Sequence, residues 1–216
     1  MPPSRRAASP PDATRVSEAA LHEAALTHLT RYAATEAGLR RVLDRRIDRW
    51  ARAQGGAQGG GQGGAAGADM PAPMGADAVA ETVAAARAAA RAVVARLAAA
   101  RALNDAEFAA ARARSLTRAG RSRQAIAAYL AAKGVARETA RAALPAEPGA
   151  ELVAALLQAR RRRLGPFRAG EADALTRRKE LGVLARAGFA QEVAAQALGT
   201  DRTEAEALIA EARNGG

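Results

Sequence analysis

Residue types that commonly carry out chemistry are scarce in this chain. Its two histidines, His22 and His28, lie six positions apart, so on a helix they project from different faces and cannot chelate one metal together. Cysteine is absent, which removes both disulfides and a thiolate nucleophile. The run GGGQGG lacks the Lys-[Ser/Thr] of a phosphate-binding loop, and Asp105 and Glu107 stand where acids favour the start of a helix. We therefore expect no catalytic residue, metal or cofactor, and a protein that is not an enzyme.

Arginine is the remaining residue type that could bind a partner. The chain has 33 basic residues, of which only Lys133 and Lys179 are lysines, and its net charge is +11. The planar guanidinium group binds carboxylates and phosphates through two parallel hydrogen bonds. This strong positive balance favours a polyanionic partner, either nucleic acid or an acidic protein surface.

The basic residues concentrate in two places. Segment 104–146 has eight basic and three acidic residues, a net charge of +5 that no other segment reaches. The run Arg160–Arg163 covers all sides of one helical turn, so at least two of its side chains must face solvent. We predict partner contact by Arg112, Arg114, Arg118, Arg121, Arg123, Lys133, Arg137, Arg160, Arg161, Arg162 and Arg163. The alternative is an ordinary solvated surface. Because Tyr129 and Phe108 are expected in the core, base stacking is unsupported and backbone or acidic-surface contact is favoured.

An internal repeat indicates which elements position these residues. The pattern Leu-x-x-x-Gly-[Val/Phe], followed by matched Glu, Ala and Leu residues, begins at Leu130 and again 54 positions later at Leu184. The same offset carries Ser122 onto Thr176. A fainter copy lies 87 positions upstream, where Thr35 and Leu43 match Ser122 and Leu130. Such repeats are typical of stacked helical units, which more often form a binding surface than an active site.

Helix boundaries follow from capping residues. Side chains that can accept an unpaired backbone N–H precede four expected helices, at Ser17, Thr35, Ser122 and Thr176. Gly134 and Gly188 are predicted to end matched helices, with the next apolar residue folding back onto its own repeat. The helix after Ser17 is expected to bury a stripe that includes His28 and Tyr32. No segment shows the alternation of a β-strand.

We therefore predict an all-α, elongated fold of three tandem three-helix repeats. Alanine supplies helix propensity where large apolar residues are few. The expected parts are a disordered N-terminal tail (1–16), a first repeat (17–103) interrupted by a flexible Gly-rich linker (53–77), a second repeat (104–146), a third repeat (147–199), and a C-terminal acidic helix and tail (200–216). No apolar run reaches the length of a membrane span, and the N-terminus lacks the apolar stretch of a secretory signal. A cytoplasmic protein without membrane contact is expected.

Segment 103–135 resembles the central signature of the RecX regulatory proteins. The matching residues are Leu103-Asn104-Asp105, Phe108-Ala109, Gly120-x-Ser122 and Leu130-x-x-Lys133-Gly134-Val135. The segment YAATEAGLRRVLDRRI resembles the family's first repeat, and RAGFAQEVAAQAL resembles its third. The resemblance covers most of 20–200.

The resemblance implies a curved, elongated monomer of tandem three-helix repeats. It also implies a protein that lodges in the groove of RecA filaments on DNA and restrains ATP hydrolysis, strand exchange and filament growth. Direct contact with the DNA backbone is a second expected mode. Two alternatives stay open, a general basic helical nucleic-acid-binding protein without RecA specificity and a helical scaffold. Pure phosphate binding falls steeply with salt, which separates the first alternative from filament binding.

Overall fold

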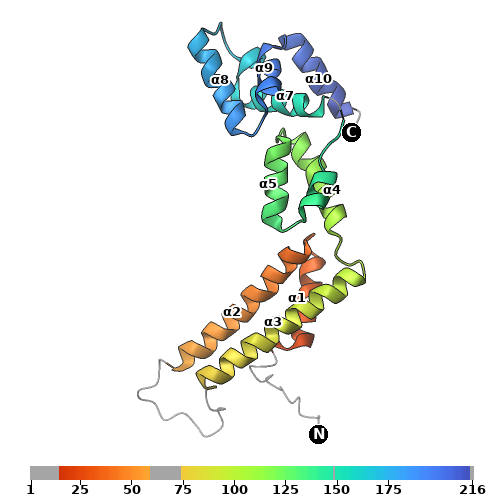
Figure 1. Cartoon of the computed structure of the whole chain (residues 1–216), viewed down its shortest axis with the longest axis vertical. Helices are drawn as coiled ribbons and strands as arrows, with labels where there is room; N and C mark the ends of the chain where they lie inside the picture. Colours follow the sequence, from red (N-terminus) through yellow and green to blue (C-terminus); the bar gives the residue numbers. More distant parts are fainter. Residues whose placement is uncertain (1–14, 59–73, 148, 215–216) are drawn as a thin grey trace, which may run out of the picture. The chain divides into compact units, whose positions relative to one another are not determined.

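The computed structural model describes residues 15–58, 74–147 and 149–214, and within these ranges every regular element is a helix (Figure 1). The chain forms two compact units that divide after Asn104. The prediction of an all-α fold is confirmed.

The first unit contains α1 (Glu18–Leu29), α2 (Glu36–Gln58) and α3 (Ala76–Ala99) around one core. α3 packs along both α2 and α1. The Ser17 hydroxyl accepts the Ala20 N–H at 3.3 Å, and the Thr35 hydroxyl accepts the Gly38 N–H at 2.9 Å. Both caps were predicted. The core is centred on fully buried side chains of all three helices, among them Leu21, Leu39, Leu43, Ile47 and Val93.

The boundaries of the first unit differ from the sequence-based ones. α2 continues to Gln58 and α3 begins at Ala76, so both ends of the expected linker 53–77 belong to helices, and its centre, 59–73, lies outside the described residues. Of the expected tail 1–16, Val16 is buried in the core. The rest of that tail up to residue 14 also lies outside the described residues.

The expected buried stripe of α1 ends earlier than predicted. His28 is half-buried and stacks on Tyr32 with ring centroids 5.3 Å apart. Tyr32 itself is 62% exposed, so its placement on the buried stripe was wrong. The reason is that α1 ends at Leu29, and residues beyond a helix end no longer follow its 3.6-residue period.

The second unit holds two cores. α4 (Asp105–Arg118), α5 (Arg123–Lys133) and α6 (Arg137–Ala142) enclose the first of them, built on Ala109, Ala113, Ile126, Leu130, Val135 and Ala140. The second core is enclosed by α7 (Ala150–Arg162), the short 3₁₀ helix η2 (Gly165–Phe167), α8 (Ala174–Arg186), α9 (Gln191–Gly199) and α10 (Arg202–Asn214). Alanine fills many core positions, which allows close approach of the helix backbones.

Gly134 and Gly188 end their helices as predicted. Their φ angles are +84° and +87°, the left-handed region that glycine enters without a steric cost. In each case the next N–H returns to the leucine carbonyl four residues before the glycine, from Val135 at 3.1 Å and from Phe189 at 3.2 Å. Val135 and Phe189 are both buried, so each glycine turns an apolar side chain back onto its own core.

The predicted cap at Thr176 was wrong. The N-cap of α8 is Asp173, whose carboxylate accepts the Thr176 N–H at 2.8 Å. The hydrogen bonds from Thr176 lower the pKa of Asp173. An aspartate three residues upstream supplies the oxygen that the orphan N–H groups need, so the helix begins earlier than the offset from Ser122 implied.

Candidate partner-binding surface

The basic residues singled out in the sequence are almost all at the surface. Arg160 is half-buried, and the other ten of the eleven are exposed. Four belong to α4 and its end (Arg112, Arg114, Arg118 and Arg121), three to α5 and α6 (Arg123, Lys133 and Arg137), and four to the end of α7 (Arg160–Arg163). The second unit therefore carries the whole set.

One group of cations surrounds an aromatic ring. Arg112 of α4 donates from Nε to the Tyr129 hydroxyl at 3.0 Å, and its guanidinium carbon lies 5.5 Å from the ring centroid. The Lys133 Nζ lies 5.4 Å from the same centroid. Tyr129 and Phe108, both expected in the core, are half-buried and pack against it rather than inside it. Cation–π attraction at exposed sites is worth roughly 0.5–1 kcal/mol per pair, so the ring helps to hold two like charges close together.

A second group of these basic residues forms hydrogen bonds inside the second unit, where its two cores meet. Arg123 donates its backbone N–H to both carboxylate oxygens of Glu151 at 3.1 Å, and its guanidinium to the Pro145 carbonyl. Arg161 donates to the Gln158 side chain at 2.8 Å and lies 3.5 Å from the Gly120 carbonyl. Burial raises the pKa of Glu151, against the lowering effect of Arg123. These two arginines therefore contribute to the internal structure of the unit.

The remaining arginines are available to a partner. Within the described part of the chain, Arg114, Arg118, Arg121 and Arg137 make neither a side-chain hydrogen bond nor an ion pair, and the same holds for Arg162 and Arg163. Arg163 ends α7 with a φ of +56°. Of the eleven predicted residues, six exposed arginines thus have no internal partner, four cations are bound internally or against Tyr129, and Arg160 is half-buried.

The junction between the two cores depends on Ser122. Its buried hydroxyl accepts the Ala125 N–H at 3.1 Å, which caps α5, and donates to the Ala187 carbonyl at the end of α8 at 2.7 Å. A Cβ atom on Gly188 would lie 2.6 Å from that hydroxyl. These contacts link α5 to α8 across 65 positions of sequence, and no local signal in the sequence predicts them.

A buried ion pair orders the turn after the four-arginine run. Arg168 donates to the Glu180 carboxylate at 3.0 Å, and the Gly165 N–H donates to the same oxygen at 3.3 Å. Glu180 is almost fully buried. Breaking such a pair leaves an uncompensated charge, so the pair holds η2 against α8.

Other site types are not apparent in the described ranges. Among those residues, His, Cys, Asp and Glu form no group of three that could hold a metal ion. None of the helices described is long and apolar enough to span a membrane. Among the described residues of the first unit, Glu18, Ala19, His22 and Arg96 line one open surface groove. Another is lined by Arg40, Asp44, Asp48, Arg87 and Arg91.

The fold and surface define a class, namely all-helical proteins with an exposed basic surface. Residues 104–144 match the family model described as RecX, second three-helix domain. The chain is 34% identical over 196 residues to the regulatory protein RecX of Myxococcus xanthus, which covers 89% of this chain and 91% of that protein. It is 41% identical over 112 residues to the regulatory protein RecX of Agrobacterium fabrum strain C58, covering 52% of this chain and 60% of that protein.

This chain belongs to the RecX family. The expected resemblance is confirmed, and the relatives' name is consistent with a regulatory role rather than an enzymatic one. The matched domain is the part of the chain that carries α4, α5 and α6, with the exposed arginines Arg114, Arg118, Arg121 and Arg137.

Proposed function

We propose that this protein regulates the RecA recombinase by binding its filaments on DNA. Bound protein inhibits or modulates ATP hydrolysis, strand exchange and filament extension in recombination, DNA repair and the SOS response. The observation that carries the proposal is the RecX match over 104–144, on a domain in which Arg114, Arg118, Arg121 and Arg137 are exposed and have no internal partner among the described residues. The protein acts by occupying the filament groove, in the cytoplasm, as a monomer and without catalysis.

The proposed architecture is a row of three three-helix repeats. Two observations support it. Thr35 and Ser122, which the repeat aligns, are both buried N-caps. Leu43, Leu130 and Leu184, also aligned, are all fully buried. In this proposal α1–α3 form the first repeat, α4–α6 the second and α7–α9 the third, with α10 closing the chain.

Within the predicted set, we propose as contact residues those that are exposed and whose side chains have no internal partner. Arg114, Arg118, Arg121 and Arg137 are exposed and have no internal partner among the described residues, and Arg162 and Arg163 share this property. Charge complementarity speeds association with an acidic partner and fixes orientation more than it adds affinity. Arg112 and Lys133, held on Tyr129, add positive charge to the same domain. Arg123 and Arg161 act mainly through the internal structure of the unit.

The second candidate is nucleic-acid binding without RecA specificity, which the net charge of +11 favours. Binding of labelled protein to single-stranded DNA, with and without RecA and a non-hydrolysable ATP analogue, separates the two. For binding to phosphates alone, the logarithm of the affinity falls linearly with the logarithm of the salt concentration. We expect RecA–DNA filaments to retain the protein at salt concentrations that release it from DNA alone. Equal release from both would favour the second candidate.

A further inference from the structure

The solvent-facing side of α2 has an unusual composition. Between Leu39 and Arg52, every exposed residue of this helix is an arginine, namely Arg40, Arg41, Arg45, Arg49 and Arg52. Arg41, Arg45, Arg49 and Arg52 follow one another at steps of four, four and three residues, so they lie on one side of the helix. We call these four residues the α2 arginine face. At about 1.5 Å per residue, the face extends along roughly 16 Å of the helix.

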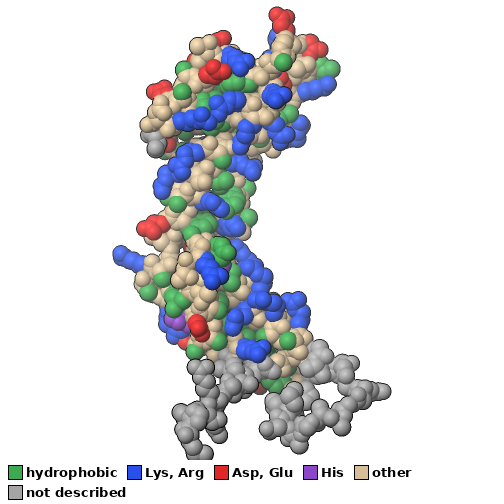
Figure 2. All heavy atoms as spheres, turned by 180° about the vertical axis from the view of Figure 1, so that it is seen from behind, with side chains coloured by type: hydrophobic (Ala, Val, Ile, Leu, Met, Phe, Trp, Pro, Cys, Tyr) green, Lys and Arg blue, Asp and Glu red, His purple; other side chains and the backbone are tan. Residues whose placement is uncertain are grey.

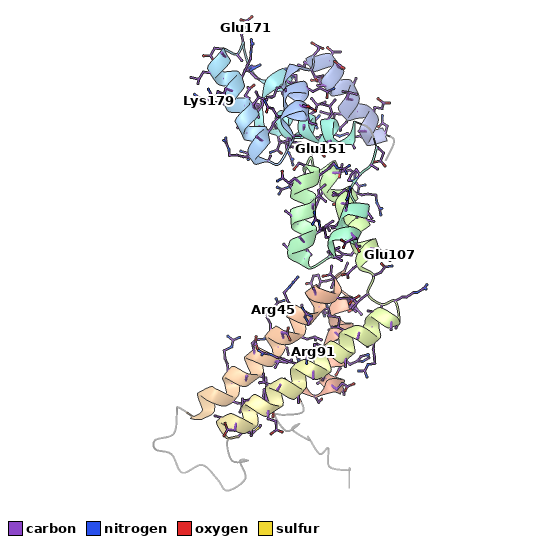
Figure 3. The ribbon with its side chains drawn as sticks, in the orientation of Figure 1. Arg45, Arg91, Glu107, Glu151, Glu171 and Lys179 are labelled. Carbon is purple, nitrogen blue, oxygen red and sulfur yellow. The ribbon has the colours of Figure 1, made fainter. Side chains whose placement is uncertain are left out.

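Three arginines of this face, Arg45, Arg49 and Arg52, are not neutralised by their own helix. Asp48 is the acid at helical spacing from both Arg45 and Arg52, but its carboxylate pairs with Arg87 of α3 at 2.9 Å. Asp44 lines the groove towards α3, together with Arg40 and Arg91. Arg45, Arg49 and Arg52 form no ion pair with any described residue. In Figure 3, Arg45 is drawn on the side of α2 that is turned away from α3.

The cations are also held at the surface in an ordered way. Arg49 donates from Nε to the Arg45 carbonyl at 3.4 Å, and Arg52 donates from Nε to the Asp48 carbonyl at 3.1 Å. These bonds lay each side chain along the helix and leave the terminal nitrogens to other acceptors. Figure 2 shows Lys and Arg side chains gathered on the surface of this unit. Like charges one turn apart destabilise a helix by roughly 0.2–0.5 kcal/mol per pair, a cost that an anionic ligand offsets.

The composition of the face distinguishes between two kinds of anionic partner. Protein interfaces are enriched in aromatic and aliphatic anchors at a desolvated core, and this stretch of α2 exposes no apolar side chain. A phosphate backbone requires only cations and donors, and arginine presents both in a planar fork. A DNA strand carries a phosphate about every 3.4 Å of axis, so the length of the face corresponds to roughly five phosphates of one strand.

We propose that the α2 arginine face is a binding site for the phosphate backbone of nucleic acid. It contacts DNA without reading sequence, and it does so whether or not RecA is present. This site lies in the first unit and is separate from the arginines of the second unit assigned above to the RecA filament. The signal was visible in the sequence as a run of arginines at helical spacing. Its meaning depends on the Arg87–Asp48 pair, which only the structure shows.

The test is fluorescence anisotropy of labelled single-stranded and duplex DNA with the full chain and no RecA, over a range of salt concentrations. The test variant carries Arg45→Gln, Arg49→Gln and Arg52→Gln, since glutamine keeps the helix propensity of arginine. A charge-matched control carries Arg177→Gln, Arg178→Gln and Lys179→Gln, three exposed cations of α8. A third variant, with lysine at the three α2 positions, keeps the charge. Circular dichroism verifies helical content in each.

We expect the α2 glutamine variant to lower the slope of log affinity against log salt by about two to three, because each lost phosphate contact removes about 0.7–0.9. The α8 control and the lysine variant should keep the wild-type slope to within about one. An unchanged slope for the α2 glutamine variant would overturn the proposal, as would an equal loss in the α8 control. Neither result would bear on the proposed RecA function of the second unit.

Discussion

At the scale of single residues, Ser122 performs two tasks with one hydroxyl. It caps α5 and donates to the Ala187 carbonyl. Ser122→Ala removes both bonds. We expect the free energy of unfolding to fall by about 2 kcal/mol, because the cap contributes about 1 kcal/mol and the Ala187 carbonyl is left without this hydrogen-bond donor. The measurement is amide hydrogen exchange in α5 and at the end of α8. Asp173→Ala is the control, because the hydrogen bonds described for this cap of α8 lead to Thr176 of the same helix. Equal effects of the two variants would show that the bond to Ala187 carries no stability.

A glycine series tests the turn geometry. We expect Gly199→Ala, at the end of α9 with open space around it, to be neutral or stabilising by up to about 1 kcal/mol. Gly134→Ala should cost about 1 kcal/mol, because its φ is +84°. Gly188→Ala should cost more than Gly134→Ala, since its Cβ would also lie 2.6 Å from the Ser122 hydroxyl oxygen.

Thermal melting followed by circular dichroism ranks the three glycine variants. The expected order of melting temperature is Gly199→Ala highest, then Gly134→Ala, then Gly188→Ala. If Gly134→Ala had the same melting temperature as Gly199→Ala, the strain attributed to the left-handed turn would be contradicted.

At the scale of elements, the start of α8 should respond to acid. Hydrogen bonds from Thr176 lower the pKa of Asp173 in the folded state. The unfolded value is about 3.9, so the contribution of this cap is fully present above that pH and is lost as the pH falls through the lower, folded pKa. Asparagine also caps helices but does not titrate.

The measurement for Asp173 is an NMR titration of its carboxyl group, together with hydrogen exchange in the first turn of α8. Protection of that turn in the wild type, relative to Asp173→Asn, should fall on acidification below about pH 4. If the ratio of protection between the wild type and Asp173→Asn is the same at every pH, or if the Asp173 carboxyl titrates at its ordinary value, the proposed cap is wrong.

The sequence predicted most helix ends, because they depend on local chemistry. Ser17, Thr35 and Ser122 are hydroxyl caps, and the glycine turns are set by their own φ angles. The error at Thr176 arose from assuming that a repeat conserves its cap, when the nearby carboxylate of Asp173 was available.

The candidate site was less predictable than the helices. Exposure of the central arginines followed from composition and helical period. However, the use of Arg123 and Arg161 inside the unit depends on Glu151, Pro145 and Gly120, which approach them only in the folded chain. Tyr129 was placed in the core because aromatic residues usually are buried, and its position between two cations is a tertiary feature.

At the scale of the whole molecule, we predict that the central segment 104–146 makes the largest contribution to RecA binding. Replacing Arg112, Arg118, Arg121 and Arg137 with alanine should raise the concentration for half-inhibition of RecA about tenfold or more, equivalent to about 1.4 kcal/mol. Helical content should not change, because these side chains are exposed and alanine favours helix.

The matched control for this quadruple variant replaces Arg177, Arg178, Lys179 and Arg186 of α8 with alanine and removes the same charge. We expect it to inhibit RecA nearly as well as the wild type. If both variants weaken inhibition equally, net charge rather than the surface of segment 104–146 determines binding to RecA.

The central claim is that this protein acts on RecA filaments, and RecA-catalysed ATP hydrolysis on single-stranded DNA tests it most directly. Increasing amounts of the full chain are added to preformed filaments, with DNA in excess so that competition for free DNA is avoided. The account predicts that the rate of hydrolysis falls in a saturable manner, and that the quadruple arginine variant requires more protein for the same fall. A rate that stays constant while the protein is shown to be folded would contradict the account.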